Sequence, residues 1–268
     1  MCEVDLLSRS QEGYNTQMFP HRAVSRGISS VLIGVFLVVV PSAVLPAQQP
    51  HRSTDTPREI IATAIEAANG DSISVTKRRW QARLNANPND HLAALGLATL
   101  ARLSYNYEDA ESRYEALAAV PNAPVVRAYA RLGQAQSADT RGLFARADSL
   151  YPVARHHARH ARDPLAEAEA LLGWAFTRAP VEGSETGFAL LDSAMALLPD
   201  DTAAATPPVT QRVSDRAFSK TLRAEYLMRR AVLRAVTGQA HGDEDAAMAR
   251  AIAHEIAAPR LEARALRS

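Results

Sequence analysis

The spacing of apolar residues predicts pairs of short helices, most clearly between Asn87 and Asn122. The first helix of this unit carries apolar residues two and three positions apart, a distribution too wide for one buried face: Leu92, Leu95, Leu97, Leu100 and Leu103. After a turn near Tyr105, the second helix carries them at intervals of three and four: Tyr107, Ala110, Tyr114, Leu117 and Val120. One such unit of about 34 residues cannot bury its own apolar side, so neighbours must stack on it.

Further helix pairs are predicted on both sides of this unit. Upstream, Thr56 is expected to cap the first of two helices, and Pro88 closes the second. Downstream, a pair over 125–162 is expected to contain a longer turn through Asp139 and Gly142. The remaining segments are predicted to be a helix pair, a polar loop and three helices, in this order: 164–198, about 200–214, 215–237, 242–257 and 259–268.

These units resemble the tetratricopeptide repeat, whose pattern is W-x2-L-G-x2-Y, then A-x3-F, then P. The matching pairs are Leu97-Ala98, Leu132-Gly133 and Leu172-Gly173 for L-G, with Ala110/Tyr114 and Ala147/Tyr151 for A-x3-F. In the central unit, Ala94 and Ala101 replace the two large aromatic residues of the first helix. The resemblance covers about residues 57–257 and implies an all-α fold, a right-handed α-solenoid of stacked helix-turn-helix repeats.

The same resemblance implies a concave groove, lined by the first helices of successive repeats, that holds peptides or partner proteins. By register with Leu97, Leu132, Leu172 and Arg230, the groove is expected to carry ten partner-binding residues: Thr99, Arg102, Arg127, Gln134, Ser137, Glu167, Trp174, Thr177, Glu225 and Met228. Trp174 is the strongest candidate, because a large aromatic side chain beside a polar rim is a common binding anchor. The alternative is that Trp174 packs against a neighbouring helix.

Residues 1–47 are typical of a leader and secretory signal peptide. Arg22 and Arg26 precede an uncharged run over 28–40, and a short segment after this run ends at the small residue Ala47. Because the arginines flank the N-terminal side of the run, the rest of the chain is expected to lie outside the cytoplasm. The predicted location is therefore exported, periplasmic or extracellular.

The alternative for the same segment is an uncleaved anchor in the inner membrane, with the repeat domain outside the cytoplasm. Residues 28–47 are just long enough to cross a bilayer, but Pro41 and Pro46 count against a full span. A flexible linker is expected over 48–56, before the repeat domain at 57–268. Acidic residues ahead of the arginines suggest that the true start is Met18.

Charge and cysteine content argue against a nucleic-acid partner and against a disulfide framework in the repeat domain. The formal net charge is +1, and the only lysines are Lys77 and Lys220, so most positive charge is arginine. No basic stripe interleaved with aromatic residues occurs, and we expect no nucleic-acid partner. The single cysteine, Cys2, belongs to the leader, so no disulfide framework is expected in the repeat domain.

Candidate catalytic or metal-binding residues are few. His156 and His160 are one helical turn apart and have the spacing of a two-histidine metal site, although no HExxH pattern accompanies them. Ser74 to Lys77 spells S-x-x-K, the nucleophile motif of serine β-lactamases, but the S-D-N and K-T-G motifs of that family are missing. We therefore expect no cofactor, no metal and no enzymatic activity.

Three functions remain open from the sequence. The first is a non-catalytic scaffold of the bacterial cell envelope that binds a protein or peptide in the groove. The second is a truncated or accessory/sensor module of a larger exported or membrane-anchored signalling system. The third is an enzyme whose site collects His156, His160 and a carboxylate.

Overall fold

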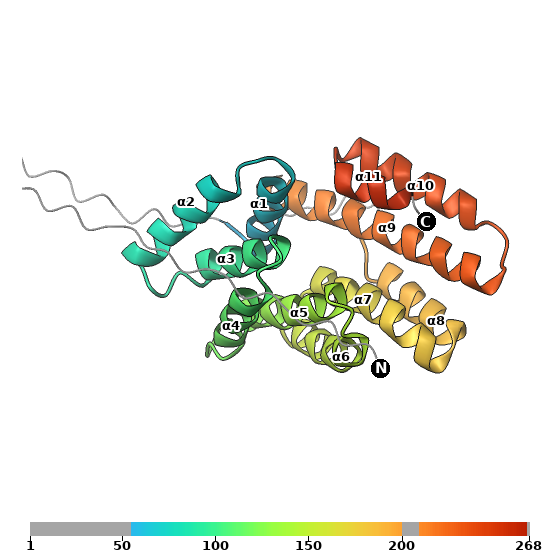
Figure 1. The fold of residues 1–268 in the computed structure, drawn as a ribbon, viewed down its shortest axis with the longest axis horizontal. Helices are drawn as coiled ribbons and strands as arrows, with labels where there is room; N and C mark the ends of the chain where they lie inside the picture. Colours follow the sequence, from blue (N-terminus) through green and yellow to red (C-terminus); the bar gives the residue numbers. More distant parts are fainter. Residues whose placement is uncertain (1–54, 200–208, 267–268) are drawn as a thin grey trace, which may run out of the picture. The chain divides into compact units, whose positions relative to one another are not determined.

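The structure is a computed structural model that describes residues 55–199 and 209–266. The described helices all belong to one compact unit within residues 52–268. They are α1 (Pro57–Asn69), α2 (Ile73–Ala86), α3 (His91–Leu103), α4 (Tyr107–Ala118), α5 (Pro124–Thr140), α6 (Phe144–His160), α7 (Pro164–Glu182), α8 (Ser184–Met195), α9 (Val209–Thr237), α10 (Gly242–Glu255) and α11 (Pro259–Ala265) (Figure 1). These ranges contain no strand, which confirms the predicted all-α class.

The helices stack in the order of the chain. Each helix from α1 to α11 contacts the next, and the alternate helices α1, α3, α5, α7 and α9 also contact one another in sequence (Figure 1). This double set of contacts is what stacked helix pairs produce, because each pair buries its apolar side against the following pair. The predicted stacking of helix pairs is confirmed, while the right-handed superhelix stays a prediction.

Local signals account for where several helices begin. Thr56 accepts a hydrogen bond at its hydroxyl from the Glu59 amide, and the Glu59 carboxylate accepts one from the Thr56 amide at 2.7 Å. This capping box, followed by Pro57, starts α1 as predicted. Asp163 starts α7 in a similar way, because its carboxylate accepts from the Ala166 amide at 3.0 Å.

Two predicted boundaries are wrong. In the 125–162 pair, the residues that were expected to form a longer turn instead extend α5 to Thr140, because the buried Ala138 continues the apolar side of the helix. Only the turn around Gly142 follows α5. Helix α9 begins at Val209, so the predicted loop at 200–214 is helical over 209–214. The sequence contains no proline or glycine between Pro208 and Gly238, so nothing interrupts a helix there. Residues 200–208 lie outside the described residues, as do the predicted signal peptide and residues 48–54 of the predicted linker.

Successive helix pairs are joined by an aromatic ring that packs on a glycine. Three rings on second helices meet three glycines on the following first helices: Trp80 and Gly96, Tyr114 and Gly133, Tyr151 and Gly173. Each ring is only 1% exposed. A Cβ atom at any of these glycines would lie closer to the ring than van der Waals contact permits. The rings and glycines therefore determine how closely neighbouring pairs approach.

This packing corrects the register of the central repeat. The glycine that receives the preceding ring is Gly96, so Leu95-Gly96 is equivalent to Leu132-Gly133, and the predicted Leu97-Ala98 is displaced by two residues. The physical reason is that only glycine leaves room for the ring. Periodicity of leucines alone cannot distinguish the two registers, because α3 carries apolar residues on most of its circumference.

Replacing Gly133 with alanine is expected to lower the free energy of unfolding by about 1–3 kcal/mol, since the new methyl group overpacks against the Tyr114 ring. This loss outweighs the gain of about 1 kcal/mol in helix propensity. Denaturant unfolding of both chains measures the difference. In a Tyr114→Leu background the same substitution should cost much less. An equal cost in both backgrounds would rule out the ring as the cause.

Candidate functional site

One side of the stack gathers polar side chains from alternate helices. We define the inner face by Ile61 of α1, Arg102 of α3, Gln136 of α5, Glu169 of α7 and Glu225 of α9. The first four line one small enclosed space, and Glu225 acts electrostatically on Glu169. The space has a volume of about 10 Å³, so it accommodates at most about one water molecule and no larger ligand.

Hydrogen bonding on the inner face is incomplete. The Gln136 amide nitrogen donates to Oε1 of Glu169 at 2.6 Å. The second oxygen of Glu169, Oε2, and the Nε atom of Arg102 are both buried and find no partner among the described residues. A buried polar group left without a partner costs about 1–3 kcal/mol. The inner face therefore contains one donor and one acceptor that an additional polar group would stabilise.

Burial raises the pKa of Glu169 to about 7, and the Glu225 carboxylate acts in the same direction. The hydrogen bond from Gln136 and the positive charge of Arg102 oppose this rise, while the Asp163 carboxylate adds to it. Because burial is the largest cause, the charged form of Glu169 is the unfavourable one. Glu169 therefore changes charge near neutral pH, which no feature of the sequence indicated.

Five of the ten predicted groove residues are buried. These are Thr99, Gln134, Ser137, Thr177 and Met228, each at most 4% exposed. The three hydroxyl groups among them donate to carbonyl oxygens of their own helices: Thr99 to Leu95 at 2.9 Å, Ser137 to Gly133 at 2.8 Å and Thr177 to Trp174 at 3.1 Å. In this structure these five side chains offer no surface to a partner.

Three further groove candidates face the preceding helix pair. Arg127 donates to the carbonyl oxygen of Val120 at 2.7 Å, in the loop after α4. Glu167 accepts from Arg155 of α6 at 3.1 Å. Trp174 donates its indole N–H to the Asp148 carboxylate of α6 at 2.9 Å and packs against two of the apolar clusters. Of the ten, Arg102 and Glu225 belong to the inner face as defined above, and the buried Thr99 lines the same enclosed space.

Replacing Trp174 with alanine is expected to lower the free energy of unfolding by about 2–4 kcal/mol, because the ring joins two apolar clusters. Trp174→Phe retains most of the packing but removes the hydrogen bond to Asp148, and it should cost about 1 kcal/mol. Thermal and denaturant unfolding distinguish the two variants. An unchanged melting transition in Trp174→Ala, together with weaker partner capture, would restore Trp174 as the binding anchor.

Sequence reasoning missed Gln136 and Glu169, although a signal for them exists. Gln136 lies three residues after Gly133, and Glu169 lies four residues before Gly173. Positions three after and four before the same residue share one side of a helix. Counting from the ring-binding glycine, rather than from the leucines, therefore finds the inner face.

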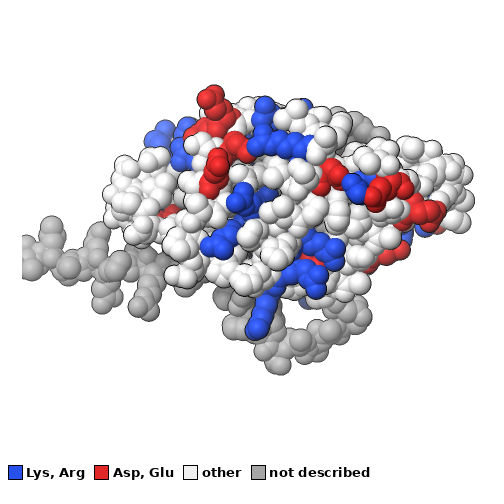
Figure 2. All heavy atoms as spheres, turned by 90° about the horizontal axis from the view of Figure 1, so that it is seen from below, with Lys and Arg blue, Asp and Glu red and all other residues white. Residues whose placement is uncertain are grey.

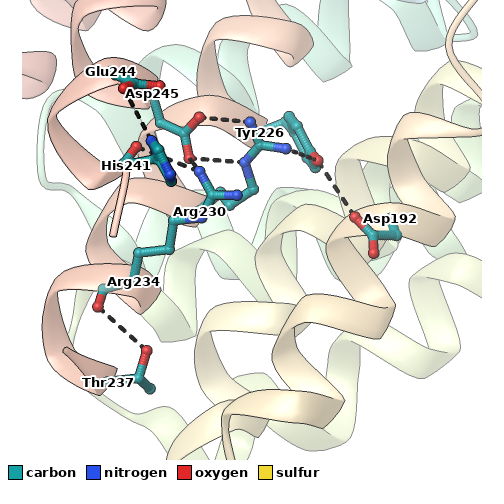
Figure 3. Close-up of polar contacts among 8 residues, drawn as sticks. All are labelled: Asp192, Tyr226, Arg230, Arg234, Thr237, His241, Glu244 and Asp245. Atoms are coloured by element: carbon teal, nitrogen blue, oxygen red, sulfur yellow. Dashed lines mark hydrogen bonds and ion pairs between the residues drawn. The ribbon is translucent and has the colours of Figure 1, made fainter. Parts of the chain in front are cut away.

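A separate charged cluster lies between α8, α9 and α10 (Figure 3). Asp245 is 1% exposed and accepts hydrogen bonds from Arg230 at 2.8 and 2.5 Å and from Arg234 at 2.7 Å. Arg230 also donates to the Tyr226 hydroxyl at 2.7 Å, and that hydroxyl donates to Asp192 at 3.3 Å. The buried ion pairs of Asp245 with the two arginines join α9 to α10.

The histidines of α6 are not grouped with a third metal-ligating side chain among the described residues. The rings of His156 and His157 are 5.6 Å apart, edge to face. Burial, followed by the nearby positive charge of Arg131, lowers the pKa of His157. Among residues 55–199 and 209–266, no group of three or more histidine, cysteine or acidic side chains is placed to hold a metal ion.

The outer surface carries a shallow hollow and mixed charge. The hollow, of about 490 Å³, is lined by residues 142–146 and includes the exposed Phe144. Basic and acidic side chains both occur on the face in Figure 2, separated by wide uncharged areas. Within the described part of the chain, no helix is long and apolar enough to span a bilayer.

No protein-family model, curated protein or solved structure matches this chain.

Proposed function

We propose that the chain is a non-catalytic protein- or peptide-binding scaffold of the bacterial cell envelope, built from tetratricopeptide-like repeats. The observation that carries this proposal is the inner face, where five alternate helices contribute neighbouring side chains. Arg102 Nε and Glu169 Oε2 lack partners there. A partner that supplies one acceptor and one donor there forms hydrogen bonds that no described residue provides to these two atoms.

Export of the scaffold is part of the proposal. It is supported by the uncharged run at 28–40, by Arg22 and Arg26 before it and by the small residue Ala47 after it. The repeat domain then lies in the periplasm or outside the cell, or it remains attached to the inner membrane through 28–47. Mass spectrometry of the N-terminus of the purified protein distinguishes cleavage after Ala47 from retention of the anchor.

Capture experiments test the binding role. The full chain is immobilised and incubated with an envelope fraction, in parallel with Arg102→Glu, which reverses one charge of the inner face, and Arg79→Glu, which changes an exposed arginine of α2. A specific partner should be retained by the wild type and by Arg79→Glu and lost by Arg102→Glu, provided that both variants melt as the wild type does. Equal capture by all three chains would contradict a role for the inner face.

A further inference from the structure

Helix α1 lies across the inner face and belongs only partly to its own helix pair. It contacts α3 more extensively than α2, and it also reaches α5 and α9 (Figure 1). Ile60, Ala64 and Ala67 are buried in a cluster with Trp80 of α2 and residues of α3. Ile61 turns instead toward the central cluster and lines the enclosed space of the inner face. Helix α1 therefore covers part of the surface that the proposed function assigns to a partner.

One side chain holds the beginning of α1 to distant helices. Arg58 donates from Nε to Asp215 of α9 at 2.7 Å and from Nη1 to both oxygens of Asp163 at 2.8 Å. The same Nη1 lies 3.3 Å from the Tyr129 hydroxyl of α5. These partners are 157, 105 and 71 residues away in the sequence. We name Arg58, Tyr129, Asp163 and Asp215 the Arg58 cluster.

The fit of α1 to the inner face is incomplete. Ile61 lines the space that contains Arg102 and Glu169, and its apolar side chain cannot bond with either. The Nε atom of Arg102 and the Oε2 atom of Glu169 are left without partners beneath it. A helix with a polar side chain at this position would satisfy at least one of these atoms. At the position of Ile61, the surface beneath α1 is therefore better suited to a polar side chain than to the one that α1 supplies.

We infer that the inner face binds an amphipathic helix of a partner protein, and that α1 is the occupant that this helix displaces. The partner helix carries a basic residue in its first turn, which takes the place of Arg58 against Asp163 and Asp215. It carries a polar residue three positions later, in the place of Ile61, which bonds with Arg102 or Glu169. This inference rests on the proposed function, because it names the kind of partner that the scaffold binds.

Displacement is expected to be controlled by the Arg58 cluster. Because α1 is attached to the chain, it competes with any free helix at a high effective concentration. A short free helix is also only marginally stable in water, which weakens its competition further. Loss of the charge-assisted bonds of Arg58 weakens α1 in this competition while leaving Asp163 and Asp215 available to an incoming helix.

A peptide of residues 55–70 serves as the probe, and its binding to the full chain is followed by fluorescence anisotropy. The Arg58→Ala chain should bind this peptide about tenfold more tightly than the wild type does. A peptide with Arg58→Ala should bind the same chain about tenfold more weakly, and a peptide with Ile61→Gln should bind it more tightly. The Arg79→Ala chain, altered at an exposed arginine of α2, should match the wild type.

Hydrogen exchange provides the second readout. In Arg58→Ala the amides of α1 should exchange faster than in the wild type, while those of α6 to α8 keep their rates. Asp215→Asn, which removes the charge of one partner of Arg58, should give a smaller change in the same direction, and it replaces Arg58→Ala in the exchange measurement if that variant does not fold. Unchanged α1 exchange, or equal peptide binding by all chains, would overturn the inference. If wild-type chain still captures an envelope partner through Arg102 in that case, the proposed function survives without displacement of α1.

Discussion

Replacing Asp245 with asparagine is expected to lower the free energy of unfolding by about 3 kcal/mol, because it leaves two arginines without their buried counter-charge. The carboxylate is 1% exposed, whereas Arg230 and Arg234 are 23% and 24% exposed. Partial exposure lets water compensate part of the loss, which places the effect at the lower end of the range for buried pairs. Both arginines lie on α9, so the change loosens the contact of α9 with α10 (Figure 3).

Asp243→Asn is the matched control for this prediction. Asp243 lies in the same first turn of α10 but is exposed, so its substitution should change the free energy of unfolding by less than about 0.5 kcal/mol. Chemical denaturation of the three chains measures both effects. Similar losses in the two variants would show that the charge of the first turn, rather than the buried ion pair, stabilises this region.

The stability of the wild-type chain is expected to fall as the pH rises from about 4.5 to about 7, because of Glu169. The pKa of this carboxyl is about 7 in the folded chain, against an ordinary value of 4.5. Between these two values the folded state binds more protons than the unfolded state, so raising the pH favours unfolding. Glu169 stabilises the folded chain fully below pH 4.5, and this contribution is lost as the pH rises through about 7. The loss in the free energy of unfolding amounts to up to about 3 kcal/mol.

Glu169→Gln removes this dependence, since glutamine resembles the protonated carboxyl at every pH. The variant should be up to about 3 kcal/mol more stable than the wild type at pH 8 and nearly equal to it at pH 5. Glu66→Gln, at an exposed position of α1, serves as the control for the removal of one negative charge. Unfolding curves at both pH values provide the measurement. A difference between wild type and Glu169→Gln that does not change with pH would refute the role of Glu169.

The paired helices were predictable from the sequence because their signals are local. Thr56 and Asp163 begin α1 and α7 by bonding with amides three residues away, and the apolar spacing around Tyr114 marks α4. The stacking of pairs was also predictable, since each unit is too apolar to stand alone. The boundary of α9 was misjudged because polar composition at 209–214 was interpreted as a loop although no helix breaker occurs there.

The residues of the inner face were named only in part, because the wrong side of α5 and of α7 was chosen as the groove. On α5 and α7, where the leucine–glycine pairs were placed correctly, the groove was assigned to positions one and four after the glycine, such as Gln134, Ser137 and Thr177, and the structure buries these positions. The register of α3 depends on Gly96 meeting the Trp80 ring, a contact between two helices. The sequence analysis named Arg102 and Glu225 of the inner face as groove candidates but did not name Gln136 and Glu169.

The sequence by itself determined the helices, their approximate ends and their arrangement in pairs, because these depend on residues within about four positions of one another. Only the tertiary structure decided which side of each helix faces inward and what covers it. Arg58 meets Tyr129, Asp163 and Asp215 across 71 to 157 residues, and no local pattern encodes such a meeting. It arises because the packing of each helix pair sets the position of the next, until the first helix lies against the ninth.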